Sequence, residues 1–153
     1  MDEQVARQVL AVQGYTELGL LVDAQEELDS IDQDLVVVGM LRCDLFSRQS
    51  MWQEMSELAE RLARSSPENS QWWISWAYAV RRLESVEAAQ EILVEARKSH
   101  PEEAIIIYNL ACYASVSENY EEARELLKQA TDLDAVCKEM AMKDDDLEPL
   151  FRT

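Results

Sequence analysis

Hydrophobic residues recur along most of the chain at intervals of three and four, the spacing that places them on one face of a helix. Between Ile92 and Ala96, and again between Ala123 and Ala130, these apolar stripes are flanked by Glu, Lys and Arg. No segment alternates between apolar and polar residues for long, so strands are not expected. Prolines at positions 67 and 101 each end a helical pattern. The pattern predicts four helical hairpins, at roughly residues 7–30, 35–65, 69–99 and 103–131.

The chain repeats itself every 34 residues. The two prolines that end helical patterns are 34 residues apart, and Trp52, Val86 and Tyr120 take one equivalent position in three successive copies. A shorter copy precedes them, in which Leu21 lies 31 residues before Trp52. One hairpin cannot bury its apolar face alone, whereas stacked neighbours form a continuous core. We therefore expect an all-α stack that makes one domain of residues 1–153.

The period and the residue types resemble the tetratricopeptide repeat (TPR), whose pattern W-x2-L-G-x2-Y, then A-x3-F, then P reflects packing needs. The third copy matches this pattern best. Its matching residues are Trp73, Trp76 and Ala77, then Ala89 and Leu93, then Pro101. The resemblance implies an α-solenoid of about four TPR-like hairpins, with Trp73 and Trp76 in the core and Trp72 freer.

The C-terminal segment resembles the end of bacterial TPR proteins. The fourth copy contains Tyr108-Asn109-Leu110-Ala111-Cys112-Tyr113, and the chain ends with the acidic and apolar residues 144–151. In such proteins a short helix covers the exposed end of the stack, which corresponds here to roughly Asp134–Met142 in the segment 134–153. We expect Leu147, Leu150 and Phe151 to pack back onto that end.

The charge narrows the class of partner. Thirty-one acidic and 14 basic residues give a formal net charge of −17, which argues against binding to nucleic acid or to an anionic membrane surface. The N-terminus lacks the basic start and apolar stretch of a secretory signal, and the longest apolar runs are too short to span a bilayer. The three cysteines are widely spaced and form no CxxC pair, which is typical of free thiols. We therefore expect a cytoplasmic protein.

The sequence contains no recognisable catalytic set. His100 is the only histidine and precedes a proline in a turn, where it fits a helix C-terminus. Cys112 has no cationic neighbour within helical reach to lower its pKa. The acidic run 144–146 lacks the alternating ligands and the glycine of a Ca²⁺ loop, and we interpret it as a solvated helix start. We therefore expect no enzyme activity, no cofactor and no metal.

The family resemblance implies where a partner binds. In TPR proteins the first helix of each hairpin lines a concave surface, and positions 2, 5, 9 and 12 of that helix usually contact the ligand. Carried onto this chain, these positions imply a mostly apolar peptide-binding groove. Its candidate residues are Val9, Val37, Met40, Asp44, Ile74, Tyr78, Arg81, Ile105, Tyr108 and Cys112. Tyr78 and Tyr108 are the anchor candidates, since Tyr is enriched in binding hot spots.

Three functions follow as hypotheses. The first is a non-catalytic module that binds a protein or peptide, as an adaptor or assembly factor. The basic clamp with which co-chaperone TPR domains hold acidic tails is absent, and an acidic rim around an apolar groove predicts a basic, partly apolar partner. The alternatives are a chaperone for exported or aggregation-prone subunits, and a homo-oligomeric scaffold that uses the apolar face for self-association.

Overall fold

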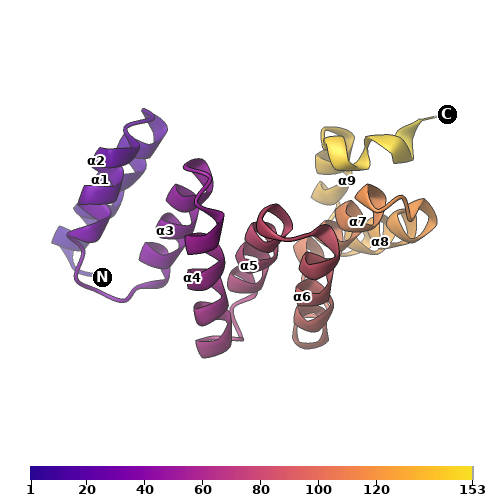
Figure 1. Cartoon of the computed structure of the whole chain (residues 1–153), viewed down its shortest axis with the longest axis horizontal. Coiled ribbons are helices and arrows are strands. Elements are labelled where there is room, and N and C mark those ends of the chain that lie inside the picture. The colour runs from indigo at the N-terminus through magenta and orange to yellow at the C-terminus, as the bar shows by residue number, and fades with distance from the viewer. Residues whose placement is uncertain (153) are drawn as a thin grey trace. The chain divides into compact units, whose positions relative to one another are not determined.

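The computed structural model describes residues 1–152 and confirms the all-α prediction (Figure 1). Over this range the chain forms nine α-helices, one 3-10 helix and no strand. They are α1 (Glu3–Glu17), α2 (Leu21–Asp29), α3 (Val36–Arg48), α4 (Trp52–Ser65), α5 (Ser70–Leu83), α6 (Val86–Ser99), α7 (Ala104–Val116), α8 (Tyr120–Leu133), α9 (Val136–Met142) and η1 (Asp145–Phe151). The first eight helices form the four predicted hairpins, and α9 is the capping helix. The first hairpin begins at Glu3, four residues earlier than the pattern indicated.

Some helices of this chain begin at a side chain that accepts a hydrogen bond from the first turn, whereas α2, α3, α7 and α8 begin without one. Asp2 accepts from the backbone N–H of Val5 at 2.8 Å and so begins α1. Ser85 accepts from the N–H of Ala88 at 3.1 Å and begins α6. Each of these bonds satisfies a donor that has no partner within its helix.

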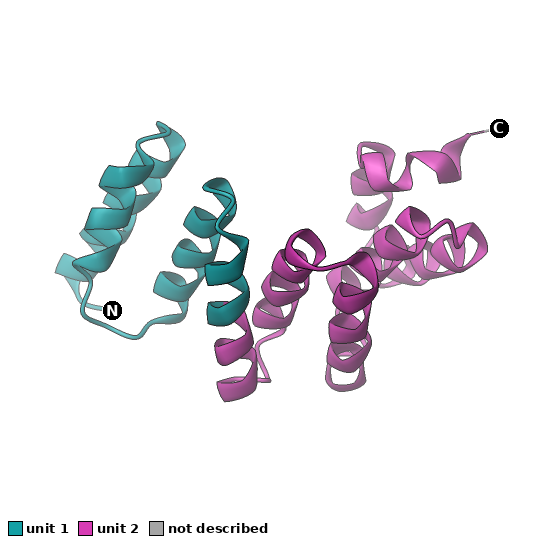
Figure 2. Cartoon of the chain, in the orientation of Figure 1, with its two compact units in different colours: residues 1–58 teal, residues 59–153 magenta. Residues whose placement is uncertain are grey.

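Contacts between residues divide the chain into two compact units, residues 1–58 and 59–153, and the division lies inside α4 (Figure 2). The N-terminal unit has its own core, which joins α1, α2 and α3 through the fully buried Val12, Leu28 and Leu45. That the whole chain is one domain stays a prediction.

The C-terminal unit has a larger core centred on α7, which buries ten of its thirteen residues. Fully buried alanines on paired helices, Ala77 with Ala89 and Ala111 with Ala123, let the helices of each hairpin approach closely. The expectation that Trp72 is freer than Trp73 and Trp76 was wrong, because Trp72 lies in this core and is only 2% exposed, against 8% for Trp73. The reason is that α5 is buried on more than one of its faces, so that the consecutive residues Trp72 and Trp73 are both buried.

Three of the hairpins turn in the same way. At Gly19, Ser50 and Glu118 the backbone is left-handed, with φ of 75°, 57° and 64°. In each case the next residue donates its N–H to the carbonyl five residues before it, as Leu20 does to Tyr15 at 2.9 Å. This bond pattern is the Schellman motif, in which a glycine is preferred at the left-handed position because it has no Cβ.

We expect Gly19→Ala to lower the free energy of unfolding by about 1 kcal/mol, because alanine is strained at positive φ. Gly14→Ala is the matched control: Gly14 lies inside α1, where alanine is preferred, and should raise that free energy by about 0.5–1 kcal/mol. At both positions an added Cβ would meet nothing within 4 Å, so backbone conformation alone decides the sign. Urea unfolding measures both effects, and shifts of equal sign would contradict this account.

Candidate functional site

In the N-terminal unit the predicted groove residues differ in accessibility. Met40 is 45% exposed, Asp44 is exposed and Val37 is half-buried, so all three present at least part of their side chains on α3. Asp44 accepts a hydrogen bond from Arg48 Nε at 2.9 Å. Val9, by contrast, is buried in the core of this unit, because α1 turns Val5, Val9 and Val12 inward.

In the C-terminal unit the predicted groove residues are partly covered. Tyr78 is 37% exposed, and Ile74, Arg81 and Ile105 are half-buried. Tyr108 and Cys112 are both buried. Their polar atoms contact a part of the chain that follows α9, and we call residues Asp144–Leu147 the acidic segment.

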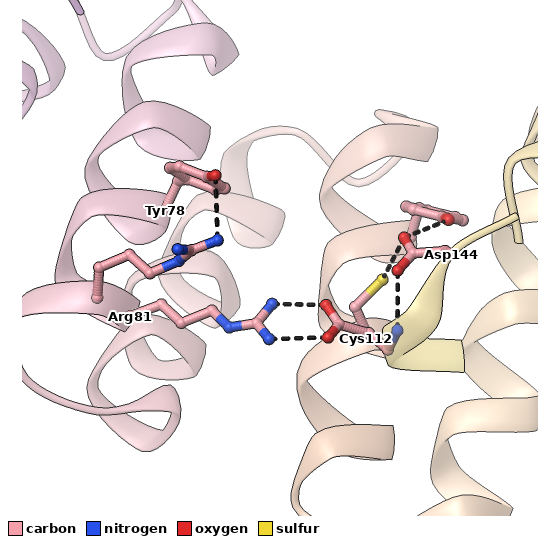
Figure 3. Close-up of polar contacts among 7 residues, drawn as sticks. Tyr78, Arg81, Cys112 and Asp144 are labelled. Carbon is pink, nitrogen blue, oxygen red and sulfur yellow. Dashed lines mark hydrogen bonds and ion pairs between the residues drawn. The ribbon is translucent and has the colours of Figure 1, made fainter. Parts of the chain in front are cut away.

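The acidic segment is bound to α5 and α7 through its side chains (Figure 3). Arg81 donates from Nη1 and Nη2 to the two carboxylate oxygens of Asp146, at 2.6 and 2.9 Å. Tyr108 Oη donates to Asp144 Oδ2 at 2.8 Å, and Cys112 Sγ lies 3.6 Å from the same oxygen. Asp144 Oδ1 accepts from the backbone N–H of Asp146 at 3.0 Å, which confirms the predicted helix start. The start is not wholly solvated, however, since Asp146 pairs with Arg81.

Leucines following the acidic pair fix the segment to the core. Leu147 is fully buried, and Leu150 is half-buried against the same core, as expected. Phe151 differs from the expectation, because it is 50% exposed. Three consecutive acidic residues are therefore held close to the apolar core by the leucine that follows them.

Burial and the two carboxylates control the protonation of the site. Burial raises the pKa of the Cys112 thiol, the carboxylates of Asp144 and Asp146 raise it further, and Arg81 opposes them. Burial also raises the pKa of Tyr108, and Asp144 adds to this effect. The hydrogen bond to Asp146 raises the pKa of Arg81. At neutral pH Tyr108 and Cys112 therefore remain protonated donors, and Arg81 remains a cation.

This cluster contains the atoms of a conceivable metal site, since Cys112 Sγ and one carboxylate oxygen each from Asp144 and Asp146 lie within 4.8 Å of one another. Metal binding needs a thiolate and free carboxylate oxygens. Here Arg81 engages both oxygens of Asp146, and the raised pKa keeps the Cys112 thiol protonated. The arrangement therefore fits a hydrogen-bonded ion pair better than a metal centre.

His100 lies away from this cluster. It ends α6, as its sequence position predicted, and its Nε2 lies 2.9 Å from the carbonyl oxygen of Pro67. The contact joins two inter-repeat turns of the C-terminal unit. This contact gives the His100 side chain a structural role in linking the two turns.

The sequence did not reveal that Asp144 and Asp146 face Arg81 and Tyr108. Arg81 and Asp146 are 65 residues apart, and no repeat relates them. The one available signal was the position of Arg81 on the first helix of its hairpin, where a buried cation needs a counter-charge.

Helical hairpins with small buried residues at their crossings define a TPR-like fold, which confirms the predicted resemblance. No protein-family model and no curated protein matches this chain. Among solved structures, the chain is similar to YrrB, described as a TPR protein with an unusual peptide-binding site, with a TM-score of 0.66 and 14% identity over 88% of this chain and 72% of that one. It is similar to MamA from Desulfovibrio magneticus RS-1, with a TM-score of 0.65 and 15% identity over 98% and 90% of the two chains. Within the described residues, no helix is long and apolar enough to cross a membrane.

We expect Arg81→Gln to lower the free energy of unfolding by about 1–3 kcal/mol, because it leaves the half-buried carboxylate of Asp146 without its cation. Arg82→Gln removes the same charge from the exposed side of α5 and should change stability by no more than about 0.5 kcal/mol. Urea unfolding of the two variants tests this. If both variants lost the same free energy of unfolding, the pairing of Arg81 with Asp146 would contribute nothing beyond the loss of one positive charge.

Because its pKa is raised, Cys112 should remain a thiol at about pH 8 and react at least about ten-fold more slowly with a disulfide reagent when folded than when unfolded. A variant with Cys43→Ala and Cys137→Ala isolates this thiol, since the chain has three cysteines and all are free and buried. Stopped-flow absorbance in buffer and in urea gives the two rates. Similar rates would contradict a buried, protonated Cys112.

Proposed function

We propose that this chain is a non-catalytic protein-interaction module, an adaptor or assembly factor that holds a peptide or helix on the faces of its first helices. The TPR-like fold supports interaction with a protein, because stacked helical hairpins provide extended binding surfaces. The observation that carries the proposal is the exposed apolar side chains on α3, Val36 and Met40, beside the acidic Asp44. The neighbour YrrB, described as having a peptide-binding site, supports a peptide as the ligand.

The charge of the N-terminal unit favours a basic, partly apolar partner. Residues 1–58 contain 12 acidic and three basic residues. All three arginines pair with carboxylates of the same unit: Arg7 with Glu3, Arg42 with Asp29 and Arg48 with Asp44. The remaining acidic side chains would attract a basic partner and raise its association rate.

Self-association is a second candidate, because α1, the turn after it and α2 also expose large apolar side chains. Leu10, Leu18 and Val22 are all more than two-thirds exposed. A face of this kind serves equally well in a chaperone that shields aggregation-prone clients. Light scattering separates these alternatives: a dimer that excludes partners supports a scaffold, and a monomer that co-purifies with an insoluble client supports a chaperone.

We expect Met40→Asp to reduce capture of partner proteins by about ten-fold or more, because it places a charge in the apolar contact. Val22→Asp is the matched control, since Val22 is an exposed apolar residue on a second helix. Affinity capture with the full chain and quantitative mass spectrometry compares the two variants with the parent protein. The captured proteins should be basic on average, and circular dichroism checks that both variants fold.

A partner set that both variants retain would exclude the α3 face. A set lost with both variants would place binding outside the first helices and contradict the proposal. Repeating the capture at about 1 M salt separates the charged and apolar contributions, because salt screens exposed charges.

A further inference from the structure

The acidic segment lies where the family resemblance places a ligand. Arg81, Tyr108 and Cys112 were assigned to the groove as residues that contact a bound peptide, and all three instead contact Asp144 or Asp146 (Figure 3). The face formed by Arg81, Tyr108 and Cys112 is therefore already occupied by the acidic segment of the same chain.

The segment is held more like a bound peptide than like a packed helix. Its polar contacts to α5 and α7 are made by side chains, namely the two bonds from Arg81, the bond from Tyr108 and the contact with Cys112. The segment leads into the 3-10 helix η1, and 3-10 helices of this length have weak internal hydrogen bonding. Two carboxylates and the buried Leu147 position the segment, and Leu150 further along η1 packs against the same core.

The contacts define a recognition pattern. The two engaged acidic residues are two positions apart, the residue between them, Asp145, is exposed, and the leucine that directly follows them is fully buried. The receptor side supplies a planar guanidinium that binds both oxygens of one carboxylate and a phenol that binds the other. The planar fork of arginine matches the two oxygens of a carboxylate, and it matches phosphate oxygens in the same way.

We propose that the face formed by Arg81, Tyr108 and Cys112 is a receptor for an acidic partner peptide with the pattern Asp-x-Asp-Leu, and that the acidic segment is its built-in competitor. A partner peptide of this kind displaces Asp144–Leu147 and takes over its contacts. A tethered competitor acts at an effective concentration of about millimolar. A partner peptide therefore displaces the segment only if its own concentration and affinity together outweigh this local competition.

This inference builds on the proposed function, since it assigns a ligand class to a first-helix face. The two are tested on different units, however. Met40 probes the N-terminal unit and a basic partner, whereas Arg81 probes the C-terminal unit and an acidic one. Failure of the capture experiment therefore leaves the displacement experiment informative, and the reverse holds as well.

The test uses a fluorescent peptide of residues 143–151 with blocked ends, titrated with full-length protein. In the variant Asp144→Asn/Asp146→Asn the tethered segment loses both engaged charges, so the peptide should bind at least about ten-fold more tightly than it binds the parent protein. The matched control is Asp145→Asn/Glu148→Gln, which removes two charges that contact neither Arg81 nor Tyr108, and it should bind the peptide like the parent. Adding Arg81→Gln to the first variant should abolish binding.

Hydrogen exchange of the parent protein provides a measurement that does not depend on the stability of a variant. The amides of Asp146 and Leu147 donate to Asp144 Oδ1 and to the Asp144 carbonyl, so both should exchange faster when saturating peptide displaces the segment. Equal peptide affinity for the parent and both double variants, or unchanged exchange at saturating peptide, would overturn the proposal. A dimer of the parent protein that the Asp144→Asn/Asp146→Asn variant cannot form would also overturn it, by assigning the face to the segment of a second copy.

Discussion

The fourth hairpin of this chain carries more apolar surface than its own two helices can cover. α7 buries ten of its thirteen residues, and its partner α8 can reach only one side of it. α6 contacts it from the preceding hairpin, and η1 and α9 contact it from the following segment. Fully buried alanines make this crowding feasible, since Ala111 and Ala114 leave room for neighbouring backbones. The first role of the acidic segment is therefore structural, because the helix that it begins helps to cover the apolar surface of α7.

The fold could be predicted because the sequence patterns that produce it are periodic. The 34-residue spacing and the 3.6-residue apolar stripes are local patterns, and both survive in a single sequence. The candidate site could be predicted only in part, because its partners are not periodic. The position of Arg81 followed from the repeat, but its pairing with Asp146 depends on how the chain returns after α9. Val9 was misplaced for a related reason: the first copy is short, so the phase of its ligand-facing positions could not be carried over with certainty onto α1.

The net charge of −17 has two different roles in the two units. In residues 1–58 the few arginines sit in surface pairs, which stabilise little, and most carboxylates remain available to water or to a partner. In the C-terminal unit Asp144 and Asp146 are turned toward protein donors, so part of the acidic excess is neutralised internally. A total charge therefore describes the long-range field of a protein but does not give the sign of any one face. The partners proposed for the two faces accordingly differ in charge.

The left-handed turns carry information about how the copies diverged. Gly19, Ser50 and Glu118 occupy the same backbone state, although only the first has the side chain that this state favours. In all three turns the same backbone hydrogen bond closes the end of the helix, donated by Leu20, Met51 and Asn119. The backbone bond is therefore common to the three hairpins, whereas the side chain at the left-handed position differs. The turn inside a hairpin is consequently defined by its backbone hydrogen bonds rather than by a glycine.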